Sequence, residues 1–160
     1  MTIATTIAAL QTMHASISGV ANAPTIYPGS LNTADLPMVI VWPGPAEASL
    51  AGLGYNVVQR RYRVACYVDA IEQGLGINES WQAAITLLQR FHDEYLDSTN
   101  NPLVTGTYQS WIRNKEGESP VLDGGLEVVA YPPPATGQEG YPHYYGFQIE
   151  VMVKEEWSGS

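Results

Sequence analysis

Basic residues are scarce in this chain, and charged residues of either sign are few. Its 160 residues include 7 Lys and Arg against 16 Asp and Glu, a formal net charge of −9 at pH 7. Charged residues make up 14% of the chain, against roughly 25% in an average soluble domain. The shortage of positive charge disfavours tight, sequence-independent binding to DNA or RNA. The low total charge predicts a largely uncharged surface, which suits burial against neighbouring proteins.

Cysteine, long apolar runs and targeting signals are also lacking. Cys66 is the single cysteine, so an intrachain disulfide is excluded. The longest dense apolar run, residues 38–42, falls far short of the about 20 residues that a membrane-spanning helix needs. No basic residue precedes the first apolar positions, so the chain does not begin like a secretory signal. We therefore predict a soluble protein, made in a cytoplasm, with no membrane partner.

The sequence motifs of catalysis and cofactor binding are missing as well. There is no P-loop and no Gly-x-Ser-x-Gly turn, and the two Gly-x-Gly pairs lack the third glycine of a dinucleotide fingerprint. The three histidines lack the i,i+4 spacing that turns two imidazoles toward one metal ion. We predict that the protein is not an enzyme, with no catalytic residue, no cofactor and no metal.

Two segments have the apolar spacing of amphipathic helices. In residues 2–18 the apolar side chains recur every three or four positions, and Gly19 supplies a stop. A second helix is predicted over residues 78–96, with Asn78 as its N-cap. Its apolar stripe consists of Trp81, Ala84, Ile85, Leu88, Phe91 and Tyr95.

Several other segments read as strands. Residues 38–42 are almost continuously apolar, which predicts a central strand covered on both faces. In residues 55–69 the two-residue period places Cys66 on an apolar face and Arg61 on an opposite face that is partly wet. Residues 144–154 alternate in the same way, and residues 105–113 are rich in strand-forming side chains.

The remaining segments are rich in glycine, proline or polar residues and predict connections. Residues 44–54 read as a flexible loop, and residues 114–120 as a polar connection. Asp123-Gly124-Gly125 has the composition of a tight turn, which predicts a short hairpin with strands on either side. A Gly- and Pro-rich loop is expected from residue 132 through Tyr141.

This order of elements predicts an α+β fold, a mostly antiparallel sheet with two helices packed on one face, plus long loops and a β-hairpin. Residues 1–157 are expected to form one domain and residues 158–160 a disordered tail. The predicted core consists of Ile7, Leu10, Val39, Val41, Val64, Val68, Ile85, Leu88, Ile149 and Val151.

Two unusual clusters predict a contact surface with other proteins. Three of the seven cationic residues lie close together in one strand, and Arg is the usual choice for ion pairs across interfaces. Tyrosines flank the Pro-rich loop, and Tyr is enriched in contact surfaces. Intrachain ion pairs and simple loop stiffening are the alternatives. The candidate interface residues are Arg60, Arg61, Arg63, Tyr131, Tyr141 and Tyr144.

The order of elements resembles the tail terminator proteins of long-tailed bacteriophages. The likeness rests on a short N-terminal helix, a Pro-flanked apolar strand over residues 36–43, a long Arg-bearing strand over 55–69, a second helix, and an alternating terminal strand over 145–153. It covers most of the chain and rests on layout, because no signature motif accompanies it. Other neck and tail-completion proteins share similar small α+β architecture.

The resemblance implies a structural protein of the virion, located at the junction of tail and head. Such a protein forms a homo-oligomeric ring, usually of six subunits, that caps the tail tube protein and contacts the head-side connector protein. DNA would pass through the lumen without specific binding, and surplus acid would suit that passage. The alternatives are another head-tail neck or tail-completion adaptor, a monomeric protein-binding module, and, least favoured, a small hydrolase using Cys66 or an acidic pair.

Overall fold

The computed structural model describes residues 3–50, 55–71, 77–96, 111–112, 122–132 and 141–158. The elements in chain order are α1 (Ile3–Ala15), a short 3-10 helix (Thr33–Asp35), β1 (Met38–Leu50), β2 (Tyr55–Ala70), α2 (Ile77–Leu96), β3 (Trp111–Ile112), β4 (Leu122–Ala130) and β5 (His143–Ser158).

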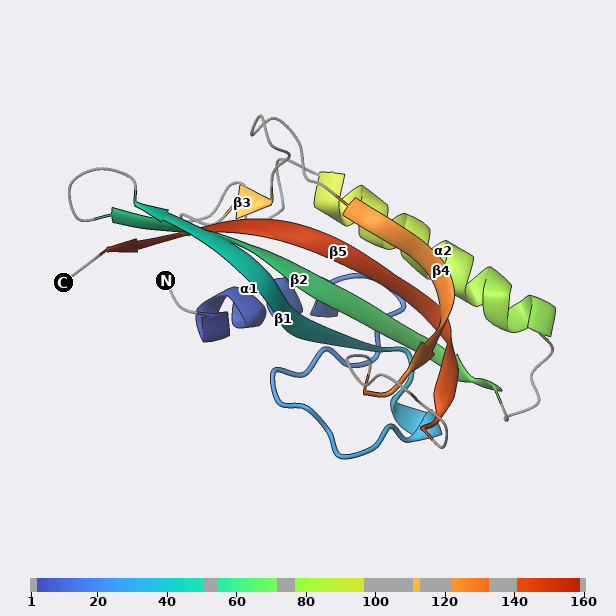
Figure 1. Ribbon diagram of the computed structural model, residues 1–160. Helices are drawn as coiled ribbons and strands as arrows, with labels where there is room; N and C mark the ends of the chain where they lie inside the picture. Colours follow the sequence, from blue (N-terminus) through green and yellow to red (C-terminus); the bar gives the residue numbers. More distant parts are fainter. Residues whose placement is uncertain are drawn as a thin grey trace.

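The five strands form one antiparallel sheet (Figure 1). β2 lies between β1 and β5, and both β3 and β4 pair with the far side of β5 at different points along its length. β4 pairs with β5 from Leu122 opposite Val151 to Ala130 opposite His143. The predicted α+β fold with a mostly antiparallel sheet is confirmed.

Both helices cover the same face of the sheet and form the main core with it. The alternating positions of β2 and β5 point their apolar side chains at this face, as the two-residue period requires. The predicted placement of two helices on one face is confirmed. The fully or nearly fully buried members of the main core include Leu10, Met13, Val39, Val41, Tyr62, Val64, Cys66, Leu87, Phe91, Tyr95, Phe147, Ile149 and Val151.

The opposite face of the sheet is only partly wet. The half of this face nearest the start of β1 carries a second apolar cluster, which includes Ile40, Ala65 and Tyr67 together with Val129 of β4. Leu31 and Leu36 from the connection between α1 and β1 pack against it. The prediction of a wet face therefore holds for Arg61 but not for the end of β2 near Tyr67, because a loop distant in sequence covers that end.

β1 differs from the predicted strand in position and in length. It is covered on both faces, as expected, but it lies at an edge of the sheet, with β2 as its strand neighbour. It also continues to Leu50, through most of the region predicted to be a loop, after a bulge between Pro43 and Ala46. Residues 51–54 lie outside the described part. Pairing with β2, in which Ala48 lies opposite Val58, holds this Ala- and Ser-rich segment extended.

The predicted turn at Asp123-Gly124-Gly125 is wrong, because these residues belong to the continuous strand β4. Gly124 has a φ of 114°, and a Cβ there would collide with the carbonyl oxygen of Gln148 on β5. The glycine therefore serves a close approach of two backbones within a sheet. The strands that are consecutive in the chain and pair with each other are β1 with β2 and β4 with β5.

The second helix differs from the prediction at its start and on one flank. It begins at Ile77, so Asn78 is within the first turn and is not the N-cap. Ile85, predicted as core, is 44% exposed, whereas Leu87 is 3% exposed and contacts the sheet. Leu88 and Ile7 are partly buried against the main core, and the other predicted core residues are buried. The helix is rotated so that the stripe's centre faces the sheet and Ile85 falls at its margin.

The ends of the predicted elements are otherwise close to those observed. The first helix ends at Ala15, and the chain turns at Gly19, which has a φ of 101°. β5 runs to Ser158, which was expected to belong to a frayed tail. Of the predicted strand at residues 105–113, only β3 is described, and residues 114–120 lie outside the described part. Neither described helix is long and apolar enough to span a bilayer.

Candidate functional site

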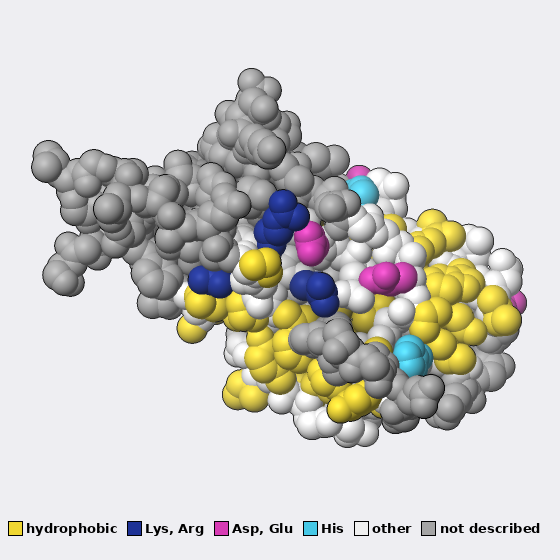
Figure 2. Space-filling model, in the orientation of Figure 1, with side chains coloured by type: hydrophobic (Ala, Val, Ile, Leu, Met, Phe, Trp, Pro, Cys, Tyr) yellow, Lys and Arg dark blue, Asp and Glu magenta, His cyan; other side chains and the backbone are white. Residues whose placement is uncertain are grey.

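Among the side chains that the structure describes, polar and charged ones gather on the face of the sheet opposite the helices, beyond the second apolar cluster. We call it the open face and define it by Arg61, Arg63, Glu127, Gln148 and Glu150. Strand alternation places them there, because each is the neighbour in sequence of a residue whose side chain points at the helices, and successive side chains of a strand point to opposite faces. Figure 2 shows basic and acidic side chains close together there, between apolar areas.

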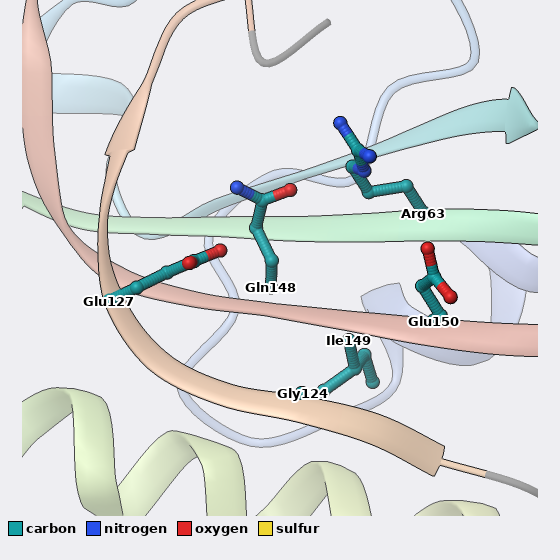
Figure 3. A pocket seen from close by; sticks show the side chains of 6 residues that line it. All are labelled: Arg63, Gly124, Glu127, Gln148, Ile149 and Glu150. Carbon is teal, nitrogen blue, oxygen red and sulfur yellow. The ribbon is translucent and has the colours of Figure 1, made fainter.

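Two adjoining hollows mark the open face, and they share Arg63 and Glu150. The larger, with a volume of about 380 Å³, is lined by Arg63, Gly124, Glu127, Gln148, Ile149 and Glu150 (Figure 3). The smaller, about 170 Å³, is lined by Trp42, Pro43, Gly44, Pro45, Arg61, Arg63 and Glu150. Together they run across the sheet from β1 to β4.

The charges of the open face are arranged by strand. Arg61 and Arg63 come from β2, whereas Glu150 comes from β5 and Glu127 from β4. Arg61 and Glu150 form an ion pair at 3.4 Å between Nη1 and Oε2, with side chains 55% and 39% exposed. Such an exposed pair contributes little to stability. Within the described part of the chain, Arg63 makes no ion pair.

The Glu127 carboxyl is perturbed by its position on the open face. Partial burial raises its pKa, while the Arg63 charge and a hydrogen bond with Gln148 act in the opposite direction. In Figure 3 the Glu127 carboxylate points along the sheet surface toward Gln148. Glu127 and Arg63 are therefore close enough to interact without forming a direct pair.

The three predicted arginines do not act as one cluster. Arg60 is next to Arg61 on β2, so strand alternation places the two side chains on opposite faces. The Arg60 Nη1 donates a hydrogen bond to the carbonyl oxygen of Gly44 at 2.8 Å. This bond holds the bulge of β1 against β2, which is a structural role. Arg61 and Arg63 share the open face, as the strand period predicted.

The predicted tyrosines also separate. Tyr131 and Tyr144 are buried in the second apolar cluster, and both lie edge-on to Tyr67. The Tyr131 hydroxyl donates to the carbonyl oxygen of Pro28. Both were candidates for a contact surface, but neither side chain is exposed in the subunit; Tyr144 belongs to β5, as its position in the alternating terminal segment predicted. Tyr141 alone of the three is exposed, which weakens the idea of a tyrosine-rich loop that grips a partner.

A buried polar network links the two helices with β1. His14 is fully buried, its Nδ1 lies 2.9 Å from Gln11 Oε1, and its Nε2 lies 2.5 Å from the Tyr95 hydroxyl. Gln11 Nε2 donates to the carbonyl oxygens of Pro24 and Val39 at 2.7 and 2.9 Å. Burial lowers the pKa of His14 to about 3, so the imidazole is neutral at pH 7. Both ring nitrogens are used, which makes this network structural.

The other candidate reactive groups do not come together. Cys66 is buried in the main core, and burial raises the pKa of its thiol, which keeps it protonated and unreactive. No three His, Cys, Asp or Glu side chains converge on a metal-sized site within the described segments. The acidic pairs considered in the sequence, Glu116 with Glu118 and Glu155 with Glu156, have side chains outside the described part.

An apolar surface lies along the outer side of α2, and sequence reasoning missed it. Four exposed side chains surround the half-buried Trp81, and we call this surface the α2–β4 flank. Its exposed members are Ile77, Ile85, Leu126 and Val128. Trp81 packs edge-on against Tyr145 with 5.0 Å between ring centres, and Val128 lies opposite Tyr145 in the sheet. The sequence did contain a signal, because the apolar positions of α2 cover more of the helix surface than contact with the sheet buries.

Compared with known proteins, the chain matches no protein-family model and no curated sequence. We therefore infer its function from its own fold, charge and surfaces.

Proposed function

We propose that this protein is a tail terminator of a long-tailed bacteriophage, a structural subunit of the virion. Copies of the chain form a ring, usually of six in such proteins, at the junction of tail and head. The ring ends the tail tube on one side and meets the head-side connector protein on the other. The chain's role is mechanical, and DNA slides through the ring without specific binding.

A three-stranded arm that extends beyond the core carries this proposal. The last described core positions along the strands are Val41, Tyr62 and Val153. The strands nevertheless continue to Leu50 on β1, and β5 continues to Ser158. Figure 1 shows β1, β2 and β5 running past both helices. Paired strands that run on past both helices form an extended surface, which suits contact with a neighbouring subunit.

Charge supports the same function. A net charge of −9 with only 7 basic residues disfavours binding to the phosphate backbone. A ring lined by such subunits repels DNA weakly and does not trap it, which a passage for the genome requires. A structure of the ring with DNA in place tests this point, because a lumen dominated by Lys and Arg would contradict it.

Imaging of the purified protein with and without tail tubes tests the proposal directly. We expect rings in negative stain and a matching oligomer mass by light scattering. Rings should also be found at the ends of tubes assembled from the tail tube protein of the same source, and tubes should stop growing when the protein is added. A chain that remains monomeric and leaves tube length unchanged would contradict the proposal.

Charge reversal on the open face is expected to weaken assembly. Arg61→Glu and Arg63→Glu each place a third carboxylate beside Glu127 and Glu150, which removes the cations available to a neighbouring subunit's acids. We expect a shift from ring to smaller species in size-exclusion chromatography with light scattering, with an unchanged circular dichroism spectrum. Gln82→Glu is the control, because it adds a carboxylate at an exposed position of α2, away from the open face. Equal assembly by all four proteins, wild type included, would remove the open face from the contact.

A further inference from the structure

The α2–β4 flank exists because, on the side toward β4, the apolar stripe of α2 continues beyond the side chains that are buried against the sheet. Toward β2, the helix is supported, since Leu87 is buried in the main core and Arg90 Nη1 donates a hydrogen bond to the carbonyl oxygen of Ser18 at 2.8 Å. Toward β4, Trp81 reaches Tyr145 on β5, and Ile85 lies further out along the same flank. β4 is the last strand on that side in the described part of the chain. The apolar stripe of α2 therefore leaves exposed apolar side chains on the side of the helix toward β4.

β4 itself offers both apolar side chains and main-chain groups at this edge. Its helix-facing residues Leu126 and Val128 are 40% and 45% exposed, although they lie on the face that the helices cover. In the segments that the structure describes, β4 pairs with β5 and with no other strand. One more strand along this edge would satisfy its outward main-chain groups and cover Ile85, Leu126 and Val128 at the same time.

The opposite edge of the sheet supplies a strand of the right kind. The first part of β1 is covered at its outer side, where Val39 N donates to Asn22 O and the Tyr27 hydroxyl donates to Val41 O. From Ala46 to Leu50, β1 belongs to the arm, and no described strand lies at its outer side. Three antiparallel pairings separate β1 from β4, so the two edge strands run in opposite directions. A second copy in the same orientation thus presents β1 antiparallel to β4.

Charge complementarity favours the same arrangement. On the open face, positive charge lies on β2, next to the β1 edge, as Arg61 and Arg63. Negative charge lies on β5 and β4, next to the opposite edge, as Glu150 and Glu127. Copies placed edge to edge bring Arg61 and Arg63, on the second strand of one sheet, nearer to Glu127 on the edge strand of the next. In a chain with a net charge of −9, this contact avoids the repulsion that two acidic surfaces would meet.

We propose that the arm of one copy adds residues 46–50 of β1 as an antiparallel strand to the β4 edge of the next copy, under the α2–β4 flank. The inference rests on the proposed ring and names the contact that closes it. The two edges differ, so the contact is head-to-tail, and repetition of a head-to-tail contact generates a ring or an open filament. Main-chain pairing supplies the register, and the apolar flank supplies buried area.

Cross-linking between two differently labelled copies tests the geometry. Val128→Cys protein is mixed with protein carrying a cysteine at each position from 46 to 50 in turn, which covers both faces of that strand, under mild oxidation. Cys66 does not interfere, because it is buried. We expect cross-linked pairs in the mixtures at one position, or at two positions that are two residues apart and share a face of the strand, and none in Val128→Cys protein alone. Cross-links in Val128→Cys protein alone, or in none of the mixtures, would overturn the proposal.

Substitutions on the flank test its contribution to affinity. Ile85→Lys and Val128→Lys put an ammonium where the added strand would bury an alkyl side chain, and we expect at least about tenfold weaker association for each. Thr86→Lys is the matched control, because Thr86 is the next residue of α2, is exposed, and points away from β4. Analytical ultracentrifugation gives the association constants, and circular dichroism verifies the fold. Equal weakening by Thr86→Lys, or none by either flank variant, would overturn the proposal.

The outcomes separate this inference from the proposed function. Rings that survive both flank substitutions and give no mixed cross-links overturn the β4–β1 contact but leave the terminator function standing. Mixed cross-links in assemblies that never bind tube ends support the contact and contradict the function. A chain that stays monomeric and gives no cross-links overturns the contact, while imaging with tail tubes decides the function independently.

Discussion

Gly146→Ala is expected to lower the free energy of unfolding by roughly 3 kcal/mol or more, because it forces an extra methyl group against the backbone of a neighbouring strand. Gly146 is buried on β5 opposite Tyr67, and a Cβ there would collide with the carbonyl oxygen of Cys66. Neither partner can yield easily, since both are main-chain atoms in the two strands that form the centre of the sheet. A loss of this size is a large part of a typical domain's total stability.

Urea unfolding followed by tryptophan fluorescence measures the effect. Gly125→Ala is the matched control: Gly125 lies on β4, its φ is not positive, and a Cβ there would meet nothing within 4 Å. We expect its unfolding midpoint to equal or slightly exceed that of the wild type, because alanine restricts the unfolded chain more than glycine does. Equal midpoints for the two variants would show that the β2 and β5 backbones separate without cost.

Acid is expected to destabilise the protein through His14. Burial holds the pKa of His14 at about 3, below the 6.5 of a free imidazole. Between these values the unfolded chain binds a proton that the folded chain does not, so this contribution to stability is complete above pH 6.5 and is lost as the pH falls toward 3. The loss amounts to about 1.4 kcal/mol per pH unit, or about 5 kcal/mol in all.

The slope of unfolding free energy against pH isolates the histidine. His14→Gln is expected to be less stable at pH 7, because it disrupts the bonds to Gln11 and Tyr95, yet to lose less stability between pH 6.5 and 4.5. His143→Gln is the control, since it makes the same substitution at an exposed position at the start of β5 and leaves the bonds of His14 intact. Parallel slopes for wild type and His14→Gln would mean that other groups govern the acid response.

The strand faces could be predicted from the sequence because the two-residue period is a property of the strand alone. Phe147, Ile149 and Val151 point at the helices, and Gln148 and Glu150 point away, as their alternation indicates. The burial of Cys66 followed from the same period. Arg61 and Arg63 were placed together on a solvent-facing side for this reason, so the centre of the open face was predictable.

Other features of the site could not be predicted, because they depend on contacts between distant segments. Asp123-Gly124-Gly125 has the composition of a turn, yet pairing with β5 makes it part of a strand. Residues 46–50 have little intrinsic strand preference, and β2 holds them extended. Tyr131 and Tyr144 were candidates for a contact surface, but the loop before β1 and the side chain of Tyr67 bury them within the subunit.

By itself, the sequence determined the α+β class, the alternation of side chains along the strands, the two helices and the acidic, weakly charged character of the chain. Each of these follows from local spacing or from composition, which no tertiary contact alters. Only the tertiary structure decided that Ile85 lies at the exposed margin of the apolar stripe of α2, that Arg60 separates from Arg61, and that β1 and β4 lie at edges of the sheet. Those outcomes depend on how each helix lies on the sheet and on which strands become neighbours. Contacts between residues far apart in the sequence determine both.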